Sequence, residues 1–327
     1  MARLGRRQAL GGLGGVSATL AMPAPAQPAW PNKPVRIVVP FNAGGAIDAL
    51  ARVIAEPLTA RLGQQVLVDP KPGANTIVGA DIVAKAAADG YTFLITTNST
   101  HTNNPSLYKS LPFDAAKDLV PVSLISLGSI LVATRADAPF TDLKGMAAWA
   151  KGLGRPVSYG SWGIGSSGHL YGLMFEKALG GTWSHVPYRG DVPALQDVGN
   201  GTLDVTWASP TSAKTQIAAG RVKAIAAAGA RRGLAMPELA TFAEQGVGGF
   251  ELRLFVAAYA PAGTPAVIVD RVGTEIAAIV ALPDVREKMI QQGQTPVGST
   301  AAELGQVLAK ETPVWAELIR ASGAKVE

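Results

Sequence analysis

The stretch that decides the fold spans residues 35–48 and reads VRIVVPFNAGGAID. Its first half, Val35–Pro40, is a short run of β-branched residues, which is typical of a buried parallel strand. Its second half is a glycine loop. The apolar residues of Ala49–Leu62 that follow fall on one face of a helix, and Gly63 suits a helix C-terminus. The stretch therefore predicts a strand, a glycine loop and a helix in direct succession.

The same unit recurs along the chain. Further short strand patterns occur at Val66–Asp69, Tyr91–Thr97, Val157–Ser161, Trp183–Pro187 and Val205–Trp207. Each is followed by a polar loop and then by a helical pattern. Strands that alternate with helices predict an α/β fold with mainly parallel sheets and helices on both faces.

Two such series are present, joined by extended segments near Ser126–Thr134 and Leu252–Tyr259. They predict two α/β lobes with two crossings between them. We expect residues 27–128 and 254–327 to form the first lobe and residues 129–253 to form the second. The helical patterns between Pro265 and Ala321 carry proline at N-terminal positions and are expected to complete the first lobe.

The first 26 residues have the pattern of a secretory signal peptide. Arg3, Arg6 and Arg7 precede the apolar run Ala9–Met22, and Ala24-Pro25-Ala26 is the small-x-small pattern that signal peptidase accepts, so we expect cleavage near Ala26. The adjacent arginines resemble a twin-arginine signal; many Sec signals also begin with arginines, so both export routes stay open. The run is too short and too rich in proline to span a membrane. We expect a soluble extracytoplasmic protein.

Charge and composition exclude several classes of function. The 327 residues carry a formal net charge of +5, of which Arg3, Arg6 and Arg7 supply three, so 5 − 3 = +2 remains after cleavage. Without a clustered basic face, we expect no nucleic acid partner. The chain has no cysteine, which excludes disulfides, thiolate catalysis and a lipid-modified N-terminal cysteine. We expect no metal, because no carboxylates cluster, and no cofactor.

Four strand-to-helix loops are candidates for a binding site. In a doubly wound sheet such loops meet at the carboxyl edge of the strands, where free backbone N–H groups and helix dipoles favour an anion such as a carboxylate. Two facing lobes can close around it. The alternative is that glycine and serine serve only turns and helix caps. The loops are Asn42–Gly45, Thr97–Thr100, Gly163–Ser167 and Ala208–Ser212.

Enzyme motifs are poorly represented. Residues 163–168 match the dinucleotide fingerprint G-x-G-x-x-G, but the next strand, Trp183–Pro187, lacks the acid that this fingerprint needs for the ribose. A nucleophile pair of His169 with Ser166 or Ser167 is conceivable, but a histidine bonded to a loop or core group is the simpler interpretation. Asp48 is interpreted as a helix-start residue. We predict that the chain is not an enzyme.

In its motifs the chain resembles the substrate-binding proteins of tripartite tricarboxylate transporters, the Bug or TctC family. The resemblance covers essentially the whole chain after the leader. The matching motifs are Pro31–Phe41, Gly44-Gly45 with Asp48 and Ala51-Arg52, Leu62–Gln64, Lys71–Ala74, Ala88–Thr92, Asn104-Pro105 with Leu107-Tyr108, His185–Tyr188, Ala260–Pro265 and Ala321–Lys325.

The resemblance implies a two-lobed periplasmic binding protein of the Venus flytrap type, type II-like. It would capture a small carboxylate in the periplasm for membrane transporter subunits, and we expect a monomer. A ligand-sensing partner of a membrane receptor is the alternative, because both roles use the same closed state. The ligand-binding residues implied are Phe41, Asn42, Ala43, Gly44, Gly45, Asn98, Ser99 and His101 in the first lobe and Trp162, Ile164, Gly165, Ser166, Ser167, Trp207, Ala208 and Ser209 in the second.

Departures from the family pattern bear on the ligand. Members often read GGGTD at residues 44–48, GNGTS at 163–167 and FDN at 207–209, where this chain has GGAID, GIGSS and WAS. Polar groups have become apolar, and the missing aspartate argues against amino-acid ligands. With Phe41, Trp162, Ile164 and Trp207 at candidate loops, our hypothesis is a carboxylate with an apolar or aromatic body. The alternative is that these side chains pack in the core or hinge.

Overall fold

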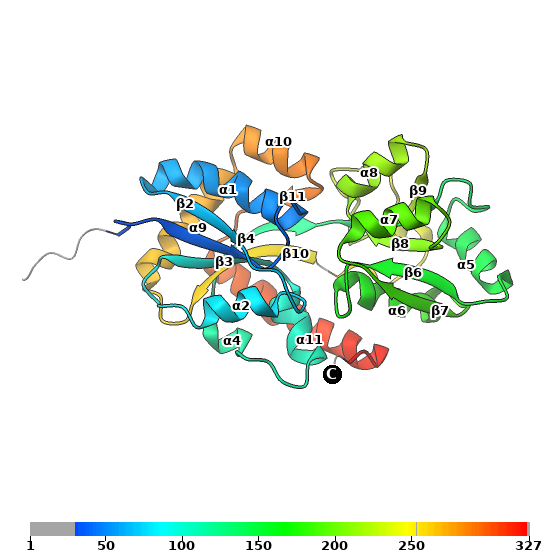
Figure 1. The fold of residues 1–327 in the computed structure, drawn as a ribbon, viewed down its shortest axis with the longest axis horizontal. Helices are drawn as coiled ribbons and strands as arrows, with labels where there is room; N and C mark the ends of the chain where they lie inside the picture. Colours follow the sequence, from blue (N-terminus) through cyan, green and yellow to red (C-terminus); the bar gives the residue numbers. More distant parts are fainter. Residues whose placement is uncertain (1–29, 253, 326–327) are drawn as a thin grey trace, which may run out of the picture.

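The computed structural model describes residues 30–252 and 254–325. The expected signal peptide at residues 1–26, its cleavage near Ala26 and the adjacent arginines lie outside the described residues. The described part forms two lobes side by side, each built around its own sheet (Figure 1).

The first lobe contains a six-stranded sheet with the order β11-β4-β10-β3-β1-β2. β1 pairs in parallel with β2 and β3, whereas β10 runs antiparallel to β3 and β4, and β11 antiparallel to β4. The strands are β1 (Val35–Val39), β2 (Val66–Pro70), β3 (Thr92–Thr97), β4 (Leu119–Gly128), β10 (Leu254–Pro261) and β11 (Gln294–Pro296).

Helices cover both faces of this sheet. On one face α1, α9 and α10 bury residues such as Leu50, Ile276 and Met289, and on the other α2 and the start of α11 bury Val83 and Leu304. The helical segments are α1 (Ala46–Leu62), α2 (Ile77–Ala84), the π-helical turn η1 (Ser99–Asn103), α3 (Asn104–Leu107), α4 (Ala115–Asp118), α9 (Ala266–Val280), α10 (Pro283–Gln291) and α11 (Ala301–Ser322).

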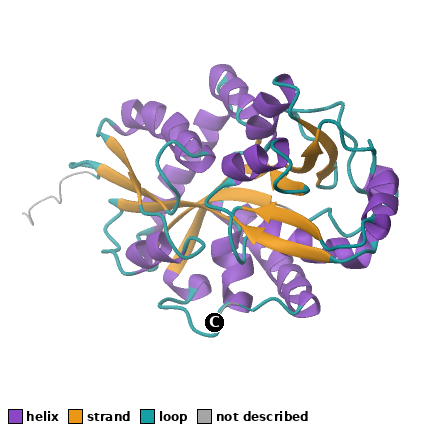
Figure 2. Cartoon of the chain, turned by 45° about the vertical axis from the view of Figure 1, so that its right-hand side comes forward, coloured by secondary structure: helices purple, strands orange, loops and turns teal. Residues whose placement is uncertain are grey.

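The second lobe contains a five-stranded sheet with the order β7-β6-β8-β5-β9, again with helices on both faces (Figure 2). Its strands are β5 (Ile130–Arg135), β6 (Val157–Ser161), β7 (Trp183–Pro187), β8 (Val205–Ala208) and β9 (Val222–Ala228). Its helices are α5 (Leu143–Gly152), α6 (Ser167–Leu179), α7 (Asp191–Gly199), α8 (Pro210–Ala218) and the short 3-10 turn η2 (Ala243–Gln245).

The predicted two-lobed α/β architecture with helices on both faces is confirmed. The sheets, however, are mixed: of the nine pairings between the described strands, four are parallel and five are antiparallel. Parallel pairing holds where paired strands follow one another through a helix, as β1 and β2 or β6 and β7 do. It fails where the chain passes between the lobes, because β4 continues into β5 with no crossover helix, and β10 returns in the opposite direction.

The strand registers show which edge of the first sheet faces the second lobe. Gly128, the last residue of β4, pairs with Leu254, the first residue of β10, so both crossings lie at this edge. Thr97, at the end of β3, pairs with Val256. β1 is parallel to β3 and therefore ends at the same edge. The loops after β1 and β3 consequently lie where the chain enters and leaves the second lobe.

The second sheet presents its corresponding edge to the first lobe. β5 begins at Ile130 directly after the crossing, and Leu131 pairs with Ala208 at the end of β8. β6 and β7 run parallel to β8 and end at the same edge. The carboxyl ends of the parallel strands of both sheets therefore meet at the crossings. We call these two edges, with the loops that follow β1, β3, β6, β7 and β8, the crossing edges.

The C-terminal helix packs on both lobes. Leu304 lies in the core of the first lobe, whereas Trp315 and Ile319 lie in the core of the second, with the Trp315 ring centroid 5.9 Å from that of Tyr171. The sequence led us to expect the tail on the first lobe alone. No helix among the described residues is long and apolar enough to cross a membrane.

Candidate ligand site at the crossing edges

The loop after β1 presents a helix start with free backbone donors. Gly45 caps α1 without any side-chain hydrogen bond, and the amides of Ala46 and Ile47 have no hydrogen-bond partner among the described residues. Asn42, Ala43 and Gly44 are exposed, and Phe41 is half-buried against the core of the first lobe. These N–H groups and the helix dipole are suited to hold an anion.

Asp48 fixes the shape of this loop. Gly44 has a φ of 77°, a conformation that favours glycine, and its amide donates to Asp48 Oδ2 at 2.9 Å. Burial acts to raise the pKa of Asp48, but hydrogen bonds from Arg52 and from the Gly44 amide outweigh it and hold this pKa below its usual value. Asp48 therefore stays ionised, is paired with Arg52 at 2.9 Å and organises the loop. This agrees with its interpretation as a helix-start residue.

The loop after β3 is buried inside the first lobe. Asn98, Ser99 and His101 are 2%, 4% and 7% exposed. The Asn98 side chain donates to Thr102 Oγ1 at 3.1 Å, and the His101 ring stacks on Tyr259 with a centroid distance of 4.2 Å. These three residues, expected from the resemblance to contact a ligand, are packed inside the first lobe in this structure.

The loop after β6 is tied together by serines and histidines. Ser166 caps α6 by accepting from the His169 amide at 3.2 Å, and the Gly165 amide donates to His169 Nδ1 at 3.1 Å. Ser161 Oγ lies 2.7 Å from His185 Nε2. The conceivable pair of His169 with Ser166 or Ser167 is thus not formed. Neither histidine has an acid partner among the contacts of the described residues, so the third group of a nucleophile triad is missing here.

Two apolar side chains lie at this loop. Ile164 is 49% exposed, and Trp162 is half-buried. The Trp162 ring lies against Gly168 at the start of α6, where a Cβ would come within 2.9 Å of Trp162 Cζ3. Ser167 is buried, but its amide at the first turn of α6 has no partner among the described residues. This loop offers an apolar surface beside a helix start.

Trp207, expected at the site, belongs to the core of the second lobe. Its side chain is 0% exposed, and its ring lies 5.1 Å from Phe175, 5.3 Å from Tyr171 and 5.6 Å from Phe242, measured between centroids. Ala208, the next residue, is also fully buried. The alternative interpretation, that an aromatic side chain at a candidate loop packs in the core, applies to Trp207.

The start of α8 is occupied by a carboxylate of the chain itself. Asp191 Oδ2 accepts from the Ser209 amide at 2.8 Å and from Ser209 Oγ at 2.7 Å, and Asp191 Oδ1 accepts from Ser212 Oγ at 3.1 Å. The sequence interpretation left these donors free and did not single out Asp191. An acid at the first position of a helix that follows a strand, as in Gly190-Asp191, is the signal that could have found it.

The buried His101 makes stability depend on pH. Burial lowers the pKa of His101 from 6.5 to about 4, outweighing a hydrogen bond to the Ala115 backbone. Between these values the unfolded chain binds a proton that the folded protein does not, so the free energy of unfolding falls as pH falls. This histidine should lower the free energy of unfolding at pH 5.5 by about 1 kcal/mol relative to pH 7.5. In urea unfolding at the two pH values, His101→Phe should reduce the pH dependence by about that amount, while His185, whose pKa is also lowered to about 4, keeps its own contribution. An unchanged pH dependence in this variant would contradict the assignment.

Among the described residues no three His, Asp or Glu side chains gather as a metal site requires.

Two α/β lobes, joined by crossings and presenting helix starts and loops to each other, define a two-lobed solute-binding protein. Residues 50–324 match the family model described as tripartite tricarboxylate transporter family receptor, TctC. The chain belongs to this family, as the sequence motifs predicted. Its members are receptors and not enzymes, which confirms the prediction that the chain is not an enzyme.

The relatives share most of their length with this chain. The UPF0065 protein in the tcbD-tcbE intergenic region of Pseudomonas sp. strain P51 is 36% identical over 321 residues, covering 98% of this chain and 95% of the relative. The solved periplasmic binding protein BugD is 34% identical with a TM-score of 0.82, and R. palustris Rpa4515, solved with adipate, is 32% identical with a TM-score of 0.84. Each alignment covers 91% of this chain and 100% of the solved chain.

Proposed function

We propose that this chain is a periplasmic receptor that captures a small carboxylate between its lobes and delivers it to the membrane subunits of a tripartite tricarboxylate-type transporter. The observation that carries the proposal is the uncapped start of α1 at the crossing edge. The free amides of Ala46 and Ile47 and the helix dipole offer a carboxylate two backbone donors and a favourable potential.

The body of the ligand would meet apolar side chains from both lobes. Phe41 is half-buried beside the α1 loop, and Trp162 and Ile164 lie at the loop after β6. Trp207 is withdrawn from this set because it is buried in the core. The solved relative with adipate supports the proposal, because adipate carries its carboxylates on an apolar hydrocarbon chain. The proposed ligand is a carboxylate with an apolar or aromatic body.

The remaining parts of the proposal concern location and assembly. Residues 1–26 act as a signal peptide that is cleaved near Ala26, and the mature chain acts in the periplasm as a monomer. Mass spectrometry of the exported protein tests the cleavage site, and its molar mass in solution tests the monomer.

A thermal-shift screen of the mature protein tests the ligand class. The panel contains aliphatic mono-, di- and tricarboxylates, amino acids and aromatic acids, and we expect the largest stabilisation from an acid with an apolar or aromatic body. The ligand should be recovered unchanged after incubation, because a receptor does not turn it over. A preference for citrate or aspartate contradicts the apolar body. No stabilisation by any carboxylate contradicts the proposed function.

A further inference from the structure

The second lobe carries a carboxylate at one of the helix starts on its crossing edge. Asp191 opens α7, directly after the loop that follows β7, and its carboxylate reaches the start of α8. Both places belong to the crossing edge of the second lobe, because β7 and β8 end there. The group therefore lies among the loops proposed to face the ligand.

Asp191 takes up the serine donors at the start of α8, whereas the Thr211 amide in the same turn has no partner among the described residues. The Ser209 amide, Ser209 Oγ and Ser212 Oγ all bond to Asp191, and the Ser212 amide donates to Ser209 Oγ at 3.3 Å. A backbone amide and two hydroxyls at a helix start are the groups that would otherwise bind a carboxylate. A second carboxylate at this place would find no free donor of this set and would meet a like charge.

Contacts with the first lobe show that this helix start lies between the lobes. Thr211 Oγ1 donates to the carbonyl of Gln291 at the end of α10 at 3.3 Å. A Cβ built on Gly293 would lie 3.2 Å from Pro210 Cδ, so the backbone after α10 touches the first turn of α8. The start of α8, whose serine donors Asp191 takes up, therefore faces the first lobe.

We propose that Asp191 determines specificity: its carboxylate takes the place of a second ligand carboxylate, so the receptor selects monocarboxylates whose far end is uncharged. This inference rests on the proposed function and names the substrate class of the same site. The starts of α1 and α8 then have different roles. The α1 loop is open to the ligand carboxylate, whereas the start of α8 already holds the carboxylate of Asp191.

Matched pairs of acids test the inference by isothermal titration calorimetry. Hexanoate is compared with adipate and benzoate with terephthalate, because each pair differs by one carboxylate. We expect the wild-type protein to bind each monocarboxylate about tenfold more tightly than its partner. In Asp191→Ala and Asp191→Asn this ratio should fall by about tenfold, because both variants remove the charge; the alanine variant also frees the serine donors. The asparagine variant keeps the side-chain size should the alanine variant fold poorly.

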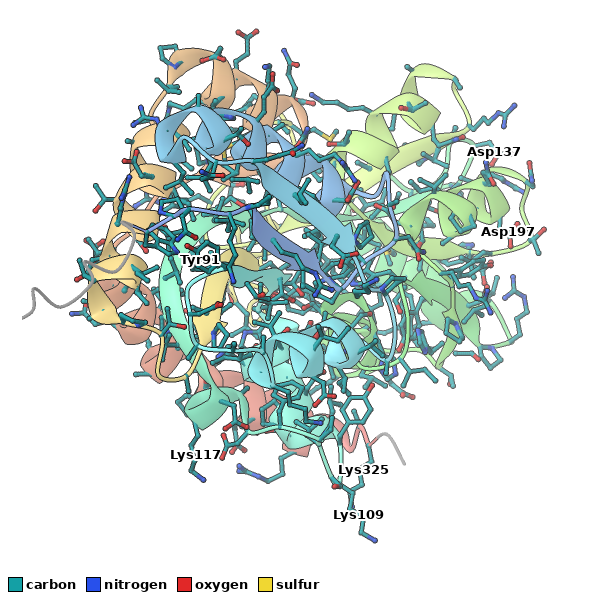
Figure 3. All side chains as sticks on the ribbon, turned by 60° about the vertical axis from the view of Figure 1, so that its left-hand side comes forward. Tyr91, Lys109, Lys117, Asp137, Asp197 and Lys325 are labelled. Carbon is teal, nitrogen blue, oxygen red and sulfur yellow. The ribbon has the colours of Figure 1, made fainter. Side chains whose placement is uncertain are left out.

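Asp197→Asn is the matched control. Asp197 lies on the same helix, accepts from the Tyr188 hydroxyl at 2.7 Å and sits at the outer margin of the second lobe in Figure 3. Asp197→Asn should leave the ratio of the two affinities unchanged. The melting temperatures of the Asp191 and Asp197 variants without ligand show whether a substitution acts only by changing the stability of the protein. An equal shift of the ratio in the control attributes it to overall charge and overturns the inference.

Other outcomes overturn the inference without touching the proposed function. Arg189 is exposed on the same edge, with no ion pair among the described residues. If it binds a second carboxylate, wild-type protein will bind adipate at least as tightly as hexanoate, and Asp191 does not select. The inference is also overturned if neither Asp191 variant changes the ratio of the two affinities. If none of the four acids binds while the wider screen finds another carboxylate, the inferred ligand class is wrong.

Discussion

Trp207→Ala should lower the free energy of unfolding by about 3–5 kcal/mol, which is the usual cost of truncating a large buried aromatic side chain. Trp207 is 0% exposed and packs against Phe175, Tyr171 and Phe242, so alanine leaves a cavity at the centre of the second lobe. Urea unfolding followed by circular dichroism measures the loss. This effect is expected to be the largest of any change considered.

Trp207→Phe is the control that separates packing from ligand contact. The Trp207 Nε1 atom is buried without a hydrogen-bond partner among the described residues, so phenylalanine loses no hydrogen bond and keeps an aromatic ring in the cluster. We expect a smaller loss of stability, and the ligand affinity of the folded protein should stay close to the wild-type value. A large loss of ligand affinity in a stable Trp207→Phe protein would show that Trp207 contacts the ligand after all.

Ala46→Pro should weaken binding of the carboxylate by about 10- to 100-fold, because it removes one backbone donor to a charged group, which contributes about 1.5–3 kcal/mol. Ala46 is the first residue of α1, where proline is well tolerated since its N–H is not used by the helix. Gly45 before it is already extended, with φ −73° and ψ 168°, as a residue before proline prefers. Calorimetry with the best ligand of the screen measures the change.

Ala46→Gly is the matched control because it changes the same side chain and keeps the amide. It should bind the ligand within about twofold of the wild-type protein, since a glycine substitution at a helix start affects mainly the helix. The melting temperatures of both variants without ligand should lie close together. If Ala46→Pro binds as tightly as Ala46→Gly, the α1 amide is not a ligand donor and the proposed position of the carboxylate is wrong.

Much of the fold could be predicted because its signals are local. The period of the apolar residues predicts strands and helices, and the buried face of α1, with Leu50, Ile54 and Leu58, follows from side-chain spacing alone. The two crossings between the lobes could also be predicted, from continuous strand patterns without a helix between them. The direction of each strand pairing could not be predicted, because the sequences of β4, β5 and β10, which form antiparallel pairs, look like those of any other apolar strand.

The candidate site was predicted only in part, because side-chain direction depends on tertiary packing. The loop after β1 and the Ser166 cap of α6 follow from local rules for turns and helix starts. Trp207 and His101 stand at the carboxyl ends of strands, as ligand residues do, yet both turn into the core. The sequence by itself places them at the edge and does not say which way they point.

The sequence by itself determined the class of the protein: the alternation of strands and helices, the two series and the family motifs are all properties of residues close together in the chain. Only the tertiary structure decided which helix starts stay open. α1 keeps the free amides of Ala46 and Ile47, whereas the Ser209 amide at the start of α8 donates to Asp191, eighteen residues earlier in the chain. A carboxylate bonds to donors that are close to it in space. Asp191 lies close to Ser209 only because β7 and β8 end at the same edge of the sheet and place the starts of α7 and α8 there.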